Sequence, residues 1–161
     1  MKILITGVAG FIGFHLANYC LKKKHTVVGI DNLNNYYDVK LKKDRLKILK
    51  KFENFKFQFV DISNEKKINI IFKKYKFTTV INLAAQAGVR YSLENPQSYL
   101  KSNLIGFFNL INISKDKKIK HFVYASTSSV YGLNSDKTFK EKNLADHPIQ
   151  FYAATKRSNE L

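Results

Sequence analysis

An apolar run at the start of the chain leads into three glycines spaced three residues apart, Gly7, Gly10 and Gly13. In a strand, glycine turn and helix, the first glycine permits a tight turn, the second lets the backbone approach a pyrophosphate, and the third lets the helix pack closely. Amide groups at the start of that helix, at Phe11 and Ile12, are expected to face the phosphates. Three glycines alone also fit an ordinary turn, so the interpretation depends on the residues that follow.

Short apolar, β-branched runs alternate with longer amphipathic stretches along the whole chain. This alternation is typical of βαβ units, in which helices cover both faces of a parallel sheet. It predicts strands at residues 2–6, 26–31, 56–61, 78–83 and 120–126, helices at 11–23, 40–51, 64–75, 97–115 and 149–161, and loops at 32–38 and 133–148. We therefore predict an α/β fold, a Rossmann-type doubly wound parallel sheet of five strands in the order 3-2-1-4-5, in one domain over residues 1–161.

Asp31 ends the second predicted strand, 18 residues after Gly13. An acidic side chain at this place accepts hydrogen bonds from the adenosine ribose, and its charge repels a 2′-phosphate, so NAD is favoured over NADP. The alternative is that Asp31 only begins a turn with Asn32. Asp61 and Ile62 close the third predicted strand and are predicted to contact adenine, although a strand-end cap explains Asp61 almost as well.

Tyr152 and Lys156 lie four residues apart near the other end of the chain, so they share one face of a predicted helix. A free tyrosine hydroxyl has a pKa of about 10. A neighbouring ammonium and a cationic nicotinamide both favour the phenolate, which can exchange a proton with a sugar hydroxyl. An isolated pair with this spacing is more often a helix-surface pair.

The fifth predicted strand ends in a cluster of hydroxyls, Ser126-Thr127-Ser128-Ser129. In an open α/β sheet, ligands bind beyond the carboxyl ends of the strands. One of these hydroxyls is therefore predicted to hydrogen-bond the reacting oxygen and orient it toward Tyr152. The alternative is a turn rich in serine and threonine that has no chemical role.

The formal net charge of +16 raises nucleic-acid binding as a rival function. Lysines recur along the whole chain, whereas arginine, the usual base-reading residue, occurs only at positions 45, 90 and 157. We therefore expect solvated helix faces and no specific nucleic-acid partner.

A single cysteine, Cys20, and four scattered histidines predict a reducing, cytoplasmic setting without a metal site. No segment has the roughly 18 unbroken apolar residues of a membrane helix, and glycines interrupt the apolar start, which disfavours a signal peptide.

Several of these segments together resemble the extended short-chain dehydrogenase/reductases that epimerise or dehydrate nucleotide sugars. The resemblance depends on the glycine triplet, Asp31, Asn82-Leu83-Ala84-Ala85, Ser126-Thr127-Ser128 and Tyr152-x-x-x-Lys156. Within that family, residues 31–38 and 84–96 look most like the UDP-glucuronate 4-epimerases.

The resemblance implies roles for individual residues. Thr127 corresponds to the catalytic serine or threonine, Tyr152 to the base, and Lys156 to the residue that binds the nicotinamide ribose and favours the phenolate. Asn103 matches a family asparagine that supports the active-site helix, although a solvent-facing polar residue is the plain alternative. The expected cofactor contacts are Gly7, Gly10, Phe11, Ile12, Gly13, Asp31, Asn32, Asp61, Ile62, Leu83, Ala84, Ala85, Asn103, Tyr152 and Lys156.

The resemblance also implies a reaction. Tightly held NAD oxidises the C4 hydroxyl of a UDP-sugar, UDP-glucuronate or UDP-galacturonate, and the 4-keto sugar turns before it is reduced on its other face. A nucleotide-sugar 4,6-dehydratase is the nearest alternative, disfavoured because Ser128 and Ser129, and no acidic residue, follow Thr127. The second alternative is that the chain is a non-catalytic NAD-binding fragment.

Members of that family are considerably longer than this chain. The resemblance therefore implies that residues 1–161 are the cofactor-binding part, that a C-terminal substrate domain is absent, and that activity of this chain alone is uncertain. The expected partners are the UDP-sugar and either a second copy or a complementing C-terminal chain. The fifth strand is expected to form an open edge of the sheet.

Overall fold

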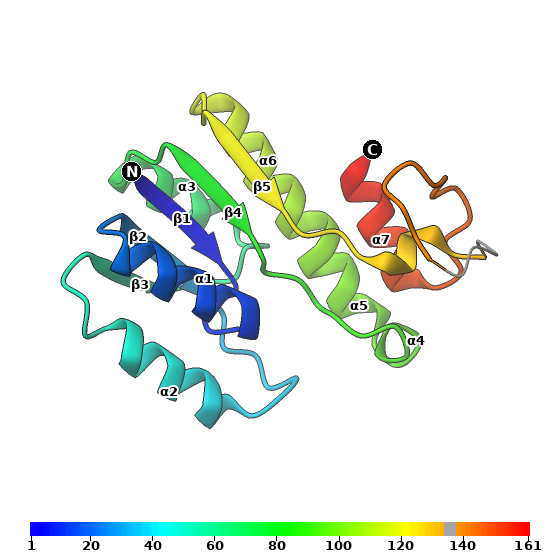
Figure 1. Ribbon diagram of the computed structural model, residues 1–161, viewed down its shortest axis with the longest axis horizontal. Coiled ribbons are helices and arrows are strands. Elements are labelled where there is room, and N and C mark those ends of the chain that lie inside the picture. Colours follow the sequence, from blue (N-terminus) through cyan, green and yellow to red (C-terminus); the bar gives the residue numbers. More distant parts are fainter. Residues whose placement is uncertain (134–137) are drawn as a thin grey trace.

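A computed structural model describes residues 1–133 and 138–161 of the chain. Its centre is a sheet of five parallel strands, with helices on both faces (Figure 1). The strands are β1 (Lys2–Thr6), β2 (Thr26–Asp31), β3 (Phe55–Phe59), β4 (Thr79–Asn82) and β5 (His121–Tyr124). Their order is β3-β2-β1-β4-β5, which confirms the predicted Rossmann-type arrangement.

Three strands end earlier than predicted, because the backbone leaves the sheet to form loops at its carboxyl edge. β3 stops at Phe59 rather than residue 61, and β4 stops at Asn82 rather than residue 83. The Leu83 amide donates to the side chain of Thr6, at 3.1 Å, rather than to a neighbouring strand. β5 ends at Tyr124 rather than residue 126, since it pairs only with β4, whose last residue lies opposite Tyr124.

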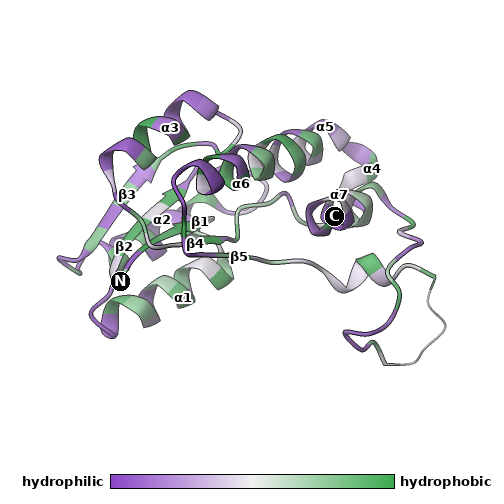
Figure 2. Ribbon diagram, turned by 90° about the horizontal axis from the view of Figure 1, so that it is seen from above, coloured by the Kyte–Doolittle hydropathy of each residue, from purple (hydrophilic) through white to green (hydrophobic). Residues whose placement is uncertain are grey.

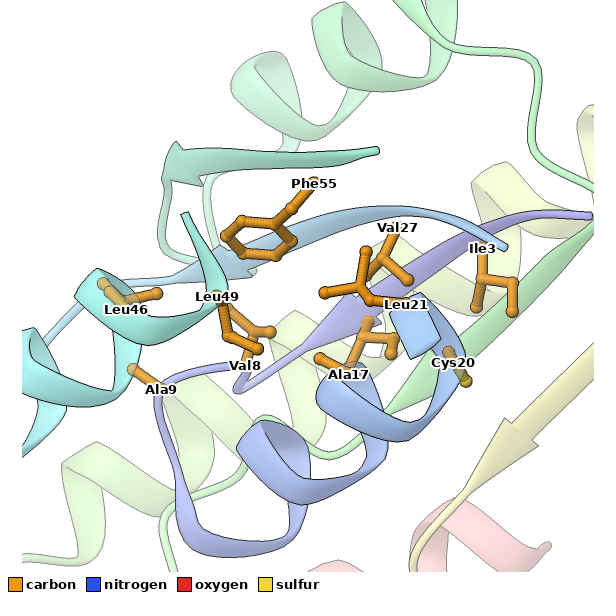
Figure 3. Close-up of a cluster of buried hydrophobic side chains, with 11 residues drawn as sticks. Ile3, Val8, Ala9, Ala17, Cys20, Leu21, Val27, Leu46, Leu49 and Phe55 are labelled. Atoms are coloured by element: carbon orange, nitrogen blue, oxygen red, sulfur yellow. The ribbon is translucent and has the colours of Figure 1, made fainter. Parts of the chain in front are cut away.

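Helices α1 (Phe11–Lys22) and α2 (Val39–Leu49) cover one face of the sheet, and α3 (Glu65–Lys74) and α6 (Gly106–Asp116) cover the other. Figure 2 shows α1 and α6 on opposite sides of the strands. Alternation along the strands explains the two cores, because successive side chains point to opposite faces. Ile3, Ile5 and Val27 pack with α1 and α2 (Figure 3), whereas Leu4 and Val28 pack with α3 and α6.

The predicted helix at 97–115 is longer and less regular than expected. It runs without a break from α5 (Pro96–Tyr99) through a π-helical turn, η1 (Leu100–Ile105), into α6. A short helix, α4 (Tyr91–Glu94), precedes it, and a 3₁₀ turn, η2 (Ser128–Tyr131), follows β5; neither was predicted.

The last helix, α7 (Phe151–Glu160), lies within the predicted range 149–161. It lies beside α5 and beyond the carboxyl end of β5 (Figure 1). Part of the predicted loop 133–148, residues 134–137, lies outside the described residues. Among the described residues, no helix has the length and apolar character needed to cross a membrane.

Candidate active site

The glycine turn after β1 has the geometry that its sequence predicts. Gly7 has a φ of +66°, and a Cβ there would lie 2.8 Å from the backbone nitrogen of Ala84, so a side chain is excluded. The Gly10 amide donates to the Gly7 carbonyl at 2.9 Å and closes the turn. A Cβ on Gly13 would overlap that same carbonyl oxygen, so α1 can pack this closely only with glycine at this position.

A pocket opens beside this turn, at the carboxyl ends of the strands. Nine of the predicted cofactor residues line it: Gly7, Gly10, Asp31, Asn32, Asp61, Ile62, Leu83, Ala84 and Ala85. The other predicted residues do not line it. Phe11 and Ile12 are exposed at the start of α1, Gly13 lies against the Gly7 carbonyl, and Asn103, Thr127, Tyr152 and Lys156 lie on other segments.

Asp31 is buried and holds two turns in place. Its Oδ2 accepts a hydrogen bond from the Ala9 amide at 3.0 Å, and its Oδ1 accepts one from the Leu33 amide at 2.8 Å. The turn expected as an alternative role of Asp31 is thus present, together with a link to the glycine turn. A carboxylate offers about four acceptor positions, so these two bonds leave room for a ligand hydroxyl.

Asp61 links the loops after β2 and β3. Its Oδ1 accepts from the amide and hydroxyl of Ser63, and its Oδ2 accepts from Asn32 Nδ2 at 3.1 Å. Burial favours the neutral acid, but these hydrogen bonds and the nearby Lys101 ammonium, 3.4 Å from Oδ2, keep the pKa of Asp61 below its ordinary value. The charged Asp61 therefore fixes Asn32 at the edge of the pocket.

Lys42 is a buried cation in the wall of this pocket and was not among the predicted site residues. Its Nζ donates to the carbonyl and side-chain oxygens of Asn34, each at 2.7 Å, and lies 4.2 Å from the centre of the Tyr37 ring. Burial lowers its pKa, Asp31 opposes that shift, and Arg45 adds to it. Lys42 therefore holds the loop 32–38 against the pocket while remaining close to the charge of Asp31.

Asn103 connects the pocket to the helix that carries Tyr152 and Lys156. Its Oδ1 accepts from the Gln86 amide at 2.8 Å, and its Nδ2 donates to the Gln86 carbonyl at 3.0 Å and to Thr155 Oγ1 at 3.1 Å. The Asn103 carbonyl accepts from Asn159 Nδ2 at 2.8 Å. Asn103 lies in the π-helical turn, so the extra residue of that turn allows its backbone and side chain to bind different partners.

Tyr152 lies on the face of α7 that packs against α5. Its ring contacts the ring of Tyr99, with 5.9 Å between centroids, and the Tyr99 hydroxyl donates to the Ala87 carbonyl at 2.8 Å. Ala87 lines the pocket. A single buried tyrosine thus lies between the pocket loop and Tyr152.

Lys156 is only 3% exposed, yet its ammonium makes no hydrogen bond or ion pair with any described residue. Burial lowers its pKa, although Glu160 opposes that shift. The ammonium is thus partly removed from water, so a ligand hydroxyl or a phenolate beside it is bound more strongly.

Thr127 caps the 3₁₀ turn η2, since its Oγ1 accepts from the Ser129 amide at 3.2 Å and lies 3.3 Å from Ser129 Oγ. The neighbouring Ser126 hydroxyl bonds to Glu160 at the end of α7. The hydroxyl cluster and α7 therefore lie side by side. No hydrogen bond joins Thr127, Tyr152 and Lys156 to one another in the described structure.

Other pocket residues were also missed: Ile30, Asn34, Tyr36, Tyr37, Val60, Gln86, Ala87 and Ser102. Gly88 was one signal that was not used. It has a φ of +99°, and a Cβ there would overlap the Tyr36 hydroxyl, so this glycine admits Tyr36 to the site. Lys42 gave no such signal, because a lysine beside Lys40 and Lys43 looks like part of a solvated helix face.

The fold and these loops define a Rossmann-type α/β domain with an attached tyrosine–lysine helix. The family model described as GDP-mannose 4,6 dehydratase matches residues 4–161. The chain therefore belongs to that family of NAD-dependent nucleotide-sugar epimerases and dehydratases, the extended short-chain dehydrogenase/reductases, which confirms the resemblance.

Individual relatives include several named as epimerases. The chain is 51% identical over 158 residues to a UDP-glucuronate 4-epimerase of Thermodesulfobacterium geofontis, covering 98% of this chain and 49% of the relative. It is 52% identical over 161 residues to Protein CapI of Staphylococcus aureus, covering 100% of this chain and 48% of the relative. The chain thus spans about half the length of the curated relatives it matches.

A solved structure gives the same result. The UDP-glucuronic acid 4-epimerase of Bacillus cereus, in complex with UDP-glucuronic acid and NAD, superposes with a TM-score of 0.88 at 36% identity. The match covers 99% of this chain and 50% of that one.

Proposed function

We propose that residues 1–161 are the NAD-binding half of a UDP-sugar 4-epimerase that interconverts UDP-glucuronate and UDP-galacturonate. The observation that carries this proposal is Lys156, a buried residue one helical turn from Tyr152 whose ammonium makes no hydrogen bond or ion pair with the described residues. Asn103 ties the helix of both residues to the loop that lines the pocket. Relatives named as UDP-glucuronate 4-epimerases support the choice of sugar.

The pocket fits NAD on the chemistry of its walls. Gly7 and Gly10 leave backbone exposed where a pyrophosphate binds, and Asp31 and Lys42 place an acceptor beside a donor for the adenosine ribose hydroxyls. Asp61 and Ile62 form the wall expected to contact adenine. When bound, NAD supplies the oxidising and reducing capacity at the sugar carbon.

The protein residues would handle the proton. Tyr152, as phenolate, accepts the proton of the C4 hydroxyl and returns it when the 4-keto sugar is reduced on its other face. The Lys156 ammonium would stabilise the phenolate, because the two residues lie on one face of α7 and Lys156 is buried. Thr127 donates a hydrogen bond to the same sugar oxygen and holds it near Tyr152.

The nucleotide end of the sugar requires further contacts, which we assign to a complementing C-terminal segment or to a second copy of the chain. Two measurements separate the parts of this proposal. Titration calorimetry with NAD tests the pocket, and chromatography after incubation with NAD and UDP-glucuronate tests turnover to UDP-galacturonate. Tyr152→Phe should abolish turnover and leave NAD binding within about twofold, whereas Tyr19→Phe, on the exposed side of α1, should change neither.

A chain that does not bind NAD would contradict the proposal as a whole. A chain that binds NAD but converts no UDP-sugar, even with a complementing segment, would limit the function to cofactor binding.

The description of the matching family favours one second candidate, a nucleotide-sugar 4,6-dehydratase. Elimination of water needs an acid close to the catalytic threonine. The residues after Thr127 are Ser128 and Ser129, which are not acidic, and this disfavours the dehydratase. Incubation with UDP-glucose distinguishes the two reactions, because a dehydratase releases a 4-keto product that is lighter by one water.

A further inference from the structure

The fold gathers many of the lysines at one edge of the molecule, although they are dispersed in sequence. Each strand begins at the edge opposite the pocket, so the connections that lead into the strands lie there together. We call this surface the lysine face. It consists of residues 1–2, 22–25, 50–54, 73–78 and 115–120.

Backbone hydrogen bonds place these segments side by side. The Thr26 amide donates to the Met1 carbonyl, and the Thr78 amide donates to the Lys2 carbonyl, each at 3.0 Å. The Lys120 amide donates to the Thr78 carbonyl at 3.2 Å. In Figure 1 the connections lie along the upper left side of the molecule, from the α2–β3 loop to the α6–β5 turn.

The lysine face contains 13 of the chain's 25 lysines within 23 of its 161 residues. An even distribution would place only about four there, so a general excess of lysine does not explain it. The lysines are Lys2, Lys22, Lys23, Lys24, Lys50, Lys51, Lys73, Lys74, Lys76, Lys115, Lys117, Lys118 and Lys120. The acidic residues among these segments are Glu53 and Asp116.

Helix dipoles explain only part of this charge. A lysine in the last turn of a helix is stabilised by the helix dipole, and this applies to Lys22, Lys73, Lys74 and Lys115. Lys23, Lys50 and Lys117 are the C-caps of α1, α2 and α6, and the other six lie outside these helix ends. None of the thirteen forms an ion pair within residues 1–133 and 138–161, so their charge is available to a partner.

We propose that the lysine face binds peripherally to an anionic lipid bilayer. The connections that form the face are short, for example residues 23–25 and 75–78, so the surface is blunt and presents no helix or ribbon that enters a nucleic-acid groove. It contains no arginine, the residue best suited to bases and to bidentate phosphate contacts. A broad array of lysines instead suits a layer of anionic headgroups, each lysine near the surface adding about 1 kcal/mol.

This orientation leaves the pocket free. The pocket lies at the carboxyl ends of the strands, and the lysine face lies at their amino ends, so a bilayer-bound protein keeps its cofactor site open to solution. The proposal is independent of the sugar and of the reaction, and it concerns peripheral binding without insertion of a helix.

Two variants with equal charge provide the test. The first, K50Q/K51Q/K73Q/K74Q, changes the carboxyl ends of α2 and α3 in the lysine face. The second, K40Q/K43Q/K66Q/K67Q, changes four exposed lysines near the amino ends of the same helices. Both lose four positive charges, and circular dichroism checks that both remain folded.

Sedimentation with phosphatidylglycerol-containing vesicles measures the binding. We expect binding to these vesicles and none to phosphatidylcholine alone, a loss of at least about tenfold in the first variant, and less than about twofold in the second. Equal losses in both variants would show that net charge alone drives binding, and no binding by the natural sequence would also overturn the proposal. Tighter binding to duplex DNA than to vesicles, at equal phosphate and salt concentration, would assign the surface to nucleic acid instead.

Discussion

Replacement of Asn103 by alanine tests whether the pocket loop and α7 are held together as the structure indicates. The side chain is 2% exposed and makes three hydrogen bonds. Two of them satisfy the amide and carbonyl of Gln86, which is itself buried and has no other described partner for these groups. Thr155 keeps a second bond, since its hydroxyl also donates to the Tyr152 carbonyl at 2.7 Å.

The expected cost follows from the groups left without partners. Asn103→Ala leaves two buried backbone groups unsatisfied, and each costs about 1–3 kcal/mol. We therefore expect a loss of about 2–6 kcal/mol in the free energy of unfolding. Asn109→Ala is the matched control, because Asn109 is buried six residues further along the same continuous helix and makes one bond, to the Ile62 carbonyl at 3.1 Å. Its loss should be about 1–2 kcal/mol.

Urea unfolding followed by far-ultraviolet circular dichroism measures both losses. Hydrogen exchange adds a local measurement, since the Gln86 amide should lose its protection in Asn103→Ala and keep it in Asn109→Ala. The reasoning is wrong if the two variants differ by less than about 0.5 kcal/mol, or if the Gln86 amide stays protected without Asn103.

Three further changes test other parts of the structure. Gly13→Ala should cost about 3 kcal/mol of unfolding free energy, measured by urea unfolding, because its Cβ overlaps the Gly7 carbonyl; an unchanged midpoint would refute this contact. Lys42→Met should weaken NAD binding about tenfold in calorimetry, whereas the exposed neighbour substitution Lys43→Met should not, and equal effects would contradict the role of Lys42. Burial raises the pKa of Tyr99 to about 12 in the folded protein, whereas a tyrosine in the unfolded chain has a pKa of about 10. Between these two pH values the unfolded chain loses the proton and the folded protein keeps it, so the stability falls as the pH rises from about 10 toward 12. Tyr99→Phe should reduce that alkaline loss of stability in urea unfolding at a series of pH values, and an identical pH dependence would show that Tyr99 is not its source.

The sheet was predictable because its signals are local. Apolar, β-branched runs between amphipathic segments predict buried parallel strands, and the right-handed crossover then restricts their order. Gly7 and Gly13 were predictable for the same reason, since each acts within the strand–turn–helix unit in which it occurs. The strand ends were less accurate, because β4 ends where Thr6, on another strand, captures the Leu83 amide.

Three of the missed features depend on how separate segments come together in the fold. The π-helical turn forms where Asn103 binds Gln86, Thr155 and Asn159, and nothing within residues 97–115 indicates those partners. Lys42 resembles its exposed neighbours until the loop 32–38 folds over it. The lysine face likewise exists only once parallel strands bring five separate segments to one edge.

The segment that follows β4 connects two motifs that lie far apart in sequence. The Leu83 and Ala84 amides donate to Thr6, at the end of the first strand, and Gln86 is held by Asn103. The end of β1 therefore positions one end of this segment, and Asn103, which also bonds to Thr155 on the helix bearing Tyr152, positions the other. A ligand that moves the segment must also strain one of these two attachments. We therefore expect binding in the pocket to be coupled to the position of α7, although the tyrosine–lysine helix does not itself line the pocket.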